Sequence, residues 1–268
     1  MIRLSLKEEP PVRISAETLT PERLSGLSVA EVERLPLAVG NRREHVGDWF
    51  RVRAGDDAAA VTFEGPCVRL DCIGAGLTVG QVAVQDDAGA YLGRGMRGGE
   101  ISVSGSAGYG AATDMRGGVI RIRGNAGDAV GGSLPGSAAG MRGGAVVIGG
   151  NAGAQAGQRP KRGLVVVGGD VGPICGAEMI AGTVVVGGAV GANPAVAMRR
   201  GTIIGLGGAA MIGPTFADCG VHDLVIFRLL ARHLVALGLA ALASRLAPFR
   251  RWAGDAAVGG KGEILVPP

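Results

Sequence analysis

Five basic residues recur at one position relative to a glycine and together could bind an anion. Each stands two residues before a glycine that opens a short apolar segment; they are Arg97, Arg116, Arg142, Lys161 and Arg199. An arginine guanidinium offers paired N–H donors that fit a carboxylate or a phosphate. If these positions stack, neighbouring charges would repel by about 1 kcal/mol in water and by more where water is excluded. The pattern therefore predicts either a cationic stripe for an anionic ligand or an acidic subunit, or a solvated face neutralised by free counter-ions.

Motifs that indicate catalysis are weak or missing in the sequence. The segment 93–98 (GRGMRG) matches the dinucleotide-binding pattern GxGxxG, but no helical pattern follows it. No GxSxG, HExxH or P-loop motif occurs, and His45, His222 and His233 show no spacing that suggests shared metal ligation. We therefore expect that this chain has no catalytic residue and no metal site, and that it binds no cofactor tightly.

The composition narrows the class of protein. Of the 268 residues, 50 are glycine, whereas Trp, Tyr and Phe number only 2, 2 and 5. So much glycine excludes a helical bundle, because each glycine costs a helix roughly 1 kcal/mol. Glycine does not recur at every third position, which excludes collagen. Apolar β-branched runs such as 183–186 (TVVV) argue against disorder. A repeat protein with glycine at its turns remains.

Charge and cysteine content indicate where the chain works. The net charge of +4 is weak support for nucleic-acid binding, and we expect none. The four cysteines contain no CxxC pair, which favours a reduced, cytoplasmic protein. Residues 225–247 are apolar but are interrupted by charged residues, so we expect no membrane span.

Seven regularly spaced glycines mark an internal repeat. They are separated by 19, 19, 26, 19, 19 and 19 residues and are Gly80, Gly99, Gly118, Gly144, Gly163, Gly182 and Gly201. The longer step matches an insertion of small residues over 128–139. Nineteen extended residues make a circuit of about 60 Å, which suits three short faces. We therefore predict an all-β fold, a right-handed parallel β-helix (solenoid) of about seven coils.

The repeat also predicts which side chains face inward. The second and fourth positions after each glycine are aliphatic, as in Ile101 and Val103, and should form the core. The third positions, which we call the outer ladder, begin polar and then become apolar, so a terminal helix or a partner must cover the later ones. Three residues before a glycine stand five methionines, which we expect to stack in the core: Met96, Met115, Met141, Met179 and Met198.

The flanks predict three regions. Residues 1–57 contain a strand at Ile2–Leu6 and a short helix opened by the capping box of Ser28 and Glu31, and should form an α/β cap. Residues 58–215 hold the glycine-rich repeats. Residues 216–268 should form a C-terminal helical segment, with the helical pattern running from Asp223 to Trp252.

The repeat unit resembles a known family. MRGG occurs at 96–99, 115–118 and 141–144, and GxxGxxxG is complete at 124–131, 150–157 and 169–176. These units resemble the C subunit of formylmethanofuran dehydrogenase and the glycine-rich C-terminal domain of the glutamate synthase large subunit. The lead-in over 37–52 (LAVGNRR to VGDWFRV) is similar to that of the formylmethanofuran dehydrogenase branch. The resemblance covers roughly residues 37–215.

Within that branch, the resemblance implies one of two complexes. The arginine-rich composition favours the bacterial one, a formyltransferase/hydrolase complex of tetrahydromethanopterin-linked one-carbon metabolism. That complex transfers a formyl group to a methanofuran-type carrier and hydrolyses it to formate. The C subunit would be its non-catalytic scaffold, beside the amidohydrolase-like A, B and formyltransferase D subunits. The basic stripe would then contact the polyglutamate tail of the carrier or another subunit.

Two alternatives stay open. The first is the C subunit of a molybdenum or tungsten formylmethanofuran dehydrogenase. The second is a free-standing glycan-acting β-solenoid, which should carry exposed aromatic platforms, although most aromatic residues of this chain lie outside the repeats.

Overall fold

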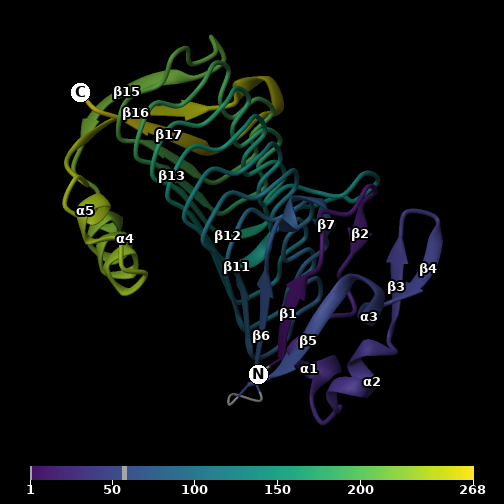
Figure 1. The fold of residues 1–268 in the computed structure, drawn as a ribbon. Coiled ribbons are helices and arrows are strands. Elements are labelled where there is room, and N and C mark those ends of the chain that lie inside the picture. Colours follow the sequence, from purple (N-terminus) through teal and green to yellow (C-terminus); the bar gives the residue numbers. More distant parts are fainter. Residues whose placement is uncertain (1, 56–58) are drawn as a thin grey trace.

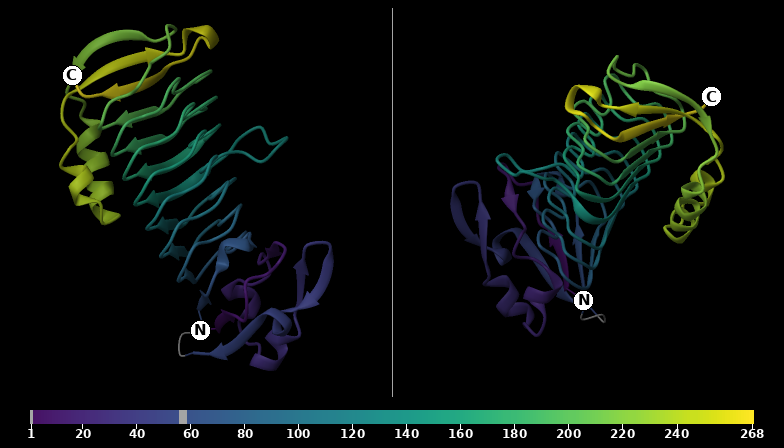
Figure 2. Two further views of the ribbon diagram at one scale, coloured as in Figure 1. Left: turned by 45° about the horizontal axis from the view of Figure 1, so that its top comes forward. Right: turned by 180° about the vertical axis from the view of Figure 1, so that it is seen from behind.

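The fold is mostly β and is built around one large sheet. The computed structural model describes residues 2–55 and 59–268, so the predicted boundary between residues 57 and 58 lies outside the described residues. Within them, a 13-stranded sheet and a 4-stranded sheet are formed (Figure 1). The repeats lie side by side in chain order between the two ends of the molecule (Figure 2).

The central strands of the large sheet are all parallel. In spatial order they are β6 (Ala60–Glu64), β8 (Gln81–Val84), β9 (Glu100–Val103), β10 (Val119–Ile122), β11 (Arg142–Ile148), β12 (Arg162–Val167), β13 (Thr183–Val186), β14 (Thr202–Gly205) and β17 (Gly262–Val266). Strands β1 (Ile2–Leu6) and β5 (Phe50–Ala54) extend the sheet at one end, and β16 (Phe249–Gly254) and β15 (Ala217–His222) at the other.

The N-terminal region packs beside the first repeats. Its short elements are β2 (Ile14–Ser15), α1 (Pro21–Leu24), α2 (Val29–Glu33), β3 (Pro36–Val39), β4 (Arg42–His45) and α3 (Val46–Trp49). Two short elements that follow β6 lie against this region: η1 (Cys67–Arg69) precedes β7 (Leu70–Asp71), and β7 pairs with β2. The predicted strand at Ile2–Leu6 is confirmed, and Ser28 and Glu31 form the predicted capping box of α2. Because β1 pairs with both β5 and β6, this region occupies one edge of the large sheet.

Pairing between repeats follows the spacing of the glycines. Glu100 pairs with Gln81 on one side and with Val119 on the other, so the partners are 19 residues apart. The longer step of 26 residues joins Val119 to Ala145, past the predicted insertion. A second set of single bridges runs from Ala88–Ala107 to Val190–Ala209 with the same steps. Each repeat is therefore tied to the next at two places.

Gly118 shows why glycine stands before the strands. Its φ is +86°, and a Cβ there would lie 2.6 Å from Cε of Met96 and 2.7 Å from the carbonyl oxygen of Gly99. Neither the backbone conformation nor the space admits a side chain. The stacked glycines therefore let successive repeats approach each other closely.

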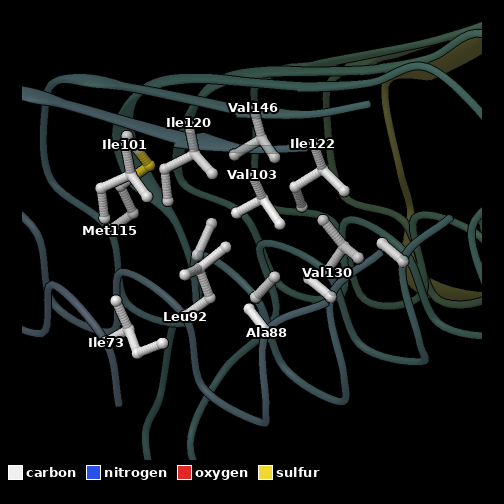
Figure 3. Packing of buried hydrophobic residues seen from close by; sticks show 14 of the residues in the cluster. Ile73, Ala88, Leu92, Ile101, Val103, Met115, Ile120, Ile122, Val130 and Val146 are labelled. Carbon is white, nitrogen blue, oxygen red and sulfur yellow. The ribbon is translucent and has the colours of Figure 1, made fainter. Parts of the chain in front are cut away.

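The side chains predicted to face inward form the main core. Ile101, Ile120 and Val146 are completely buried and lie next to one another on neighbouring strands (Figure 3). The five methionines are also completely buried, which confirms the prediction of a core column. Flexible thioether chains fill the irregular space that the glycines leave.

The C-terminal helix covers the apolar outer face of the sheet. Val166, Val185 and Ile204 of the outer ladder point away from the main core, yet at most 1% of each is exposed. They cluster with Phe227 and Leu234 of α4 (Ile226–Ala236). We predicted that either a terminal helix or a partner covers the apolar part of the outer ladder, and the structure shows that the helix does. Burial of each such side chain contributes roughly 1.5–3 kcal/mol.

The C-terminal segment is only partly helical, which corrects the expectation for residues 216–268. Helices α4 and α5 (Ala240–Ala243) are followed by β16, η2 (Ala256–Val258) and β17. Gly238, with a φ of +81°, follows the end of α4, and Pro248 precedes β16. Strand β17 pairs with β14 and β16 pairs with β17, so these strands cover an edge that a longer helix would leave open.

A column of polar side chains links the turns after the strands. Asn125 Oδ1 accepts a hydrogen bond from the backbone N–H of Asn151 at 2.8 Å, and Asn151 Oδ1 accepts one from that of Asp170 at 2.8 Å. This polar column consists of Asp87, Ser106, Asn125, Asn151 and Asp170. Each member satisfies a turn N–H of the next repeat that the strands leave without a partner. Sequence reasoning missed this column.

Candidate functional site

The basic residues predicted as a stripe do form a column. Each is exposed, and its backbone N–H donates to a carbonyl oxygen of the preceding repeat: Arg116 to Met96 at 2.7 Å, for example, and Arg199 to Met179 at 2.8 Å. The column is interrupted by Ile180, whose N–H donates to the carbonyl oxygen of Pro160. The stripe is therefore one set of stacked positions with an apolar gap before its last member.

A cavity of about 600 Å³ lies around this gap. Its lining consists of Arg142, Lys161, Arg162, Ile180, Ala181, Arg199 and Arg200. Arg97 and Arg116 do not line it. Sequence reasoning missed Arg162 and Arg200, although the doublets Lys161-Arg162 and Arg199-Arg200 were a visible signal. The structure thus brings three predicted residues together with two others.

The cavity carries uncompensated positive charge. In the described part of the chain, none of its five basic side chains forms an ion pair, whereas nearby Arg159 pairs with Glu178 at 2.8 Å. Among the acidic groups, Asp114 is influenced by the charge of Arg142, which lines the cavity. Burial raises the pKa of Asp114, although the charges of Arg142 and Arg116 act in the opposite direction. The cavity therefore suits an anion that brings several negative charges.

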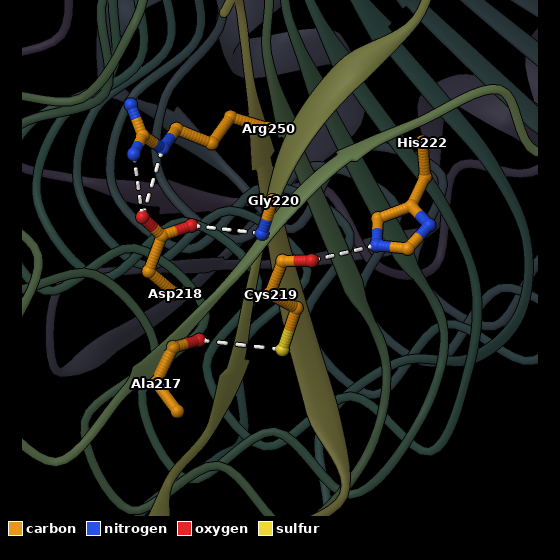
Figure 4. Close-up of polar contacts among 6 residues, drawn as sticks. All are labelled: Ala217, Asp218, Cys219, Gly220, His222 and Arg250. Atoms are coloured by element: carbon orange, nitrogen blue, oxygen red, sulfur yellow. Dashed lines mark hydrogen bonds and ion pairs between the residues drawn. The ribbon is translucent and has the colours of Figure 1, made fainter.

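Away from the basic cavity, a cluster of polar residues links strand β15 to β16 (Figure 4). Asp218 accepts hydrogen bonds from Nε and Nη2 of Arg250 at 3.0 and 2.6 Å, and these bonds lower the pKa of Asp218. Gly220 N–H donates to the same carboxylate, and a ring nitrogen of His222 lies 2.8 Å from the carbonyl oxygen of Cys219. These polar groups bind one another, so the cluster is structural.

Within the described residues, neither a metal-binding cluster nor a membrane-spanning helix is an alternative candidate site. Across residues 2–55 and 59–268, no group of three His, Cys, Asp or Glu side chains is placed to hold a metal ion. Over the same ranges, no helix has the length and apolar character needed to cross a membrane. The basic cavity is therefore the candidate site with the clearest chemistry.

Known proteins resemble the chain both in sequence and in structure. No family model matches it. The C subunit of the formyltransferase/hydrolase complex Fhc of Methylorubrum extorquens is 42% identical over 92 residues, 34% of each chain. The C subunit of the tungsten-containing formylmethanofuran dehydrogenase 2 of Methanococcus maripaludis is 32% identical over 90 residues, 33% of each chain. These alignments span about a third of the length of the curated relatives.

A solved structure extends the likeness to nearly the whole chain. A chain of the X-ray crystal structure of the formyltransferase/hydrolase complex (FhcABCD) from Methylorubrum extorquens, in complex with methylofuran, has a TM-score of 0.94 and 41% identity. The match covers 99% of each chain. The repeats and the likeness define a glycine-repeat subunit of a formyl-processing complex. The chain belongs to the family of C subunits of the formyltransferase/hydrolase complex, which are homologous to the C subunits of formylmethanofuran dehydrogenase.

Proposed function

We propose that this chain is the scaffold C subunit of a formyltransferase/hydrolase complex. The observation that carries the proposal is the match to a chain of the FhcABCD complex at 41% identity over 99% of both chains. That complex would transfer a formyl group from tetrahydromethanopterin to a methanofuran-type carrier and hydrolyse it to formate. Its partners would be the amidohydrolase-like A, B and formyltransferase D subunits, and it would work in the cytoplasm.

The identities favour this complex over the first alternative. The formyltransferase/hydrolase relative is 42% identical, whereas the tungsten- and molybdenum-containing dehydrogenase relatives are 29–36% identical over stretches of similar length. A free-standing glycan-acting protein is less well supported, because no aromatic side chain lines the basic cavity.

The fold proposed for the scaffold is a right-handed parallel β-helix of about seven 19-residue coils. Parallel strands in chain order, a second set of bridges and the repeated glycine contacts support it. We divide the chain into an N-terminal cap (1–57), the repeats (58–215) and a C-terminal segment (216–268). Both flanking segments pair with edge strands of the repeats.

In this proposal the chain supplies surfaces and no catalytic group. The stripe of Arg97, Arg116, Arg142, Lys161 and Arg199 would meet either the polyglutamate tail of the carrier or an acidic face of another subunit. Guanidinium groups without a carboxylate partner in the described residues suit both roles.

Affinity purification from the native host tests the function. The chain should carry a C-terminal tag on its chromosomal gene, and the purified material should be studied by native mass spectrometry. We expect a hetero-oligomer that contains a formyltransferase subunit and converts formyl-tetrahydromethanopterin to formate. Recovery of a molybdopterin-containing subunit would support the dehydrogenase instead, and recovery of the chain alone would contradict both assignments.

A further inference from the structure

The large sheet ends in an edge strand, β15, on its C-terminal side. Within residues 2–55 and 59–268, β15 pairs with β16 and with no other strand (Figure 2). All six of its residues are exposed or partly exposed. An edge strand presents backbone N–H and C=O groups to which another chain can add a strand. Two copies of this chain would therefore join end to end through β15 if its edge were open.

The surface around β15 favours such pairing. Val221 on the strand is 55% exposed, and Val225 and Ile226 at the start of α4 are 74% and 54% exposed. Exposed aliphatic side chains beside an open strand edge are a hazard for edge-to-edge association. This edge therefore needs protection against a second copy.

A β-bulge interrupts the pairing of β15 with β16 at the middle of the strand. The residues on either side of Cys219 and Gly220 pair with positions of β16 that have only one residue between them. Gly220 has a φ of +81°, a conformation that glycine adopts without strain. A bulge bends and twists an edge strand, so that a straight strand fits poorly beside it.

Side chains of β15 bind the backbone of the bulge (Figure 4). The carboxylate of Asp218 accepts a hydrogen bond from the Gly220 N–H at 2.9 Å. Nε2 of His222 lies 2.8 Å from the carbonyl oxygen of Cys219 and donates to it when Nε2 carries the proton. Arg250 of β16 holds the Asp218 carboxylate with hydrogen bonds of 3.0 and 2.6 Å. A backbone donor and a backbone acceptor at the middle of the edge are thus satisfied within the chain.

We propose that Asp218 and His222 guard the edge of β15 against pairing with a second copy of this chain. A second strand can bind the middle of β15 only if it displaces both side chains from the backbone and flattens the bulge. The hydrogen bonds gained would replace hydrogen bonds lost, so the exchange offers little net stabilisation. This proposal concerns one surface of the chain and does not rest on the proposed function.

The double variant Asp218→Ala/His222→Ala of the purified full-length chain tests the guard. In sedimentation velocity, the variant should dimerise at concentrations at least about tenfold lower than any at which the unaltered chain does. Cys219 reports the contact, because it is the exposed cysteine of the four and lies at the middle of β15. Oxidation with copper phenanthroline should therefore join two variant chains by a disulfide, and adding Cys219→Ser should abolish this cross-link.

Two matched variants separate the guard from general effects of substitution. Asp218→Asn keeps an oxygen that can accept the Gly220 N–H but loses the charge that pairs with Arg250, so it should remain monomeric. His45→Ala/Asp48→Ala removes the same two residue types from an exposed pair, 3.6 Å apart, in the N-terminal region. This variant should also remain monomeric.

Two further variants keep the test decisive if the double variant is unstable. His222→Ala leaves the pair of Asp218 and Arg250 intact and frees the Cys219 carbonyl, so it should dimerise more than the unaltered chain. Adding Val221→Lys to the double variant places a charge on the exposed edge and should restore the monomer.

Four results would each overturn the proposal. The first is a double variant that stays monomeric with a native circular dichroism spectrum. The second is dimerisation that persists with Val221→Lys or proceeds without a cross-link through Cys219. The third is equal dimerisation of Asp218→Asn, which would assign the effect to the ion pair with Arg250. The fourth is dimerisation of the unaltered chain with cross-linking through Cys219, which would show that the edge is open.

Discussion

Arg121 Nη1 donates a hydrogen bond of 2.8 Å to the carbonyl oxygen of Leu237, the C-cap residue of α4. The same guanidinium pairs through Nε with Glu100 at 2.9 Å. A cation at the C-terminus of a helix interacts favourably with the helix dipole and with its free carbonyl groups. The last polar residue of the outer ladder therefore fixes the end of the helix that covers the apolar ones.

Arg121→Gln should loosen the C-terminal helix. Loss of a charge-assisted bond to a helix end should lower the free energy of unfolding by about 1–2 kcal/mol. Urea denaturation followed by circular dichroism measures the change. Arg123→Gln serves as control, because Arg123 is exposed and its backbone N–H, donating to Val103, makes its hydrogen bond within the sheet. An equal loss in both variants would show that the contact to Leu237 contributes nothing specific.

Val185→Asp should detach α4 from the sheet. Val185 is completely buried beneath the helix. A carboxylate at this position would be removed from water without a hydrogen-bond or ion-pair partner, which is costly. We expect a loss of at least about 3 kcal/mol in stability or rapid proteolysis of the C-terminal segment. The control is Val225→Asp, because Val225 precedes α4 and is 74% exposed. Native-like resistance to protease in Val185→Asp would contradict the packing.

Asn151→Ala should weaken the contact between repeats. Asn151 accepts a hydrogen bond from Asp170 N–H through its side chain, and alanine leaves that donor without its partner. The expected cost is about 1 kcal/mol, measured by chemical denaturation. Gln85→Ala removes an exposed amide that lies outside the polar column and should change stability by less. Equal effects would indicate that the column does not stabilise the turns.

Gly118→Ala should be more damaging than alanine at a glycine with room around it. The added methyl would meet Met96 Cε and the carbonyl oxygen of Gly99, so we expect a loss above about 2 kcal/mol. Gly136 has a φ of +79°, but no atom lies within 4 Å of the point where its Cβ would stand, so Gly136→Ala isolates the conformational cost alone. Thermal melting of both variants gives the comparison, and similar melting temperatures would exclude a packing role for the glycine column.

Stability should fall at acid pH as Glu22 becomes protonated. Burial acts to raise the pKa of Glu22, but hydrogen bonds from Thr78 N–H, Thr78 Oγ1 and Val79 N–H outweigh it and lower the pKa to about 2. Because the pKa is lower in the folded state, the stabilisation is complete above the unfolded value near 4.5 and is lost as pH falls toward 2.

The matched variant for this effect is Glu22→Gln. It should be less stable than the unaltered chain at pH 7, and the difference should shrink between pH 4.5 and pH 2. Denaturation at a series of pH values measures it. A difference that stays constant with pH would assign the loss to packing instead of charge.

The repeat could be predicted from the sequence because its physics is local. Gly118 and its equivalents have a positive φ and little or no room for a side chain, which favours glycine there, and their spacing sets the strand register. Ile101 and Ile120 follow from alternation along a strand. The C-terminal strands are harder to predict, because they depend on contacts with distant residues. Strand Phe249–Gly254 pairs with strand Gly262–Val266, and the latter pairs in turn with Thr202–Gly205, the last strand of the repeats.

The candidate site was predictable only as a line of charges. Arg142, Lys161 and Arg199 could be aligned from their spacing, but a cavity depends on what stands between them. Ile180 is an exception to the basic pattern in the sequence, and only the structure shows the two doublets on either side of it. The polar column containing Asn151 has the same steps of 19 and 26 residues as the glycines, but its members differ in residue type, which hides the pattern.

The change from polar to apolar along the outer ladder gives each repeat a distinct place during folding. Near-identical repeats can pair one position out of step and still satisfy their backbone hydrogen bonds. In this chain such a slip would carry Arg121 beneath the apolar face of α4, or expose Val166 to water. A guanidinium buried without a partner is far costlier than a missing methyl contact. The covering helix thus selects one alignment of the repeats, a discrimination that their shared hydrogen-bond pattern cannot make.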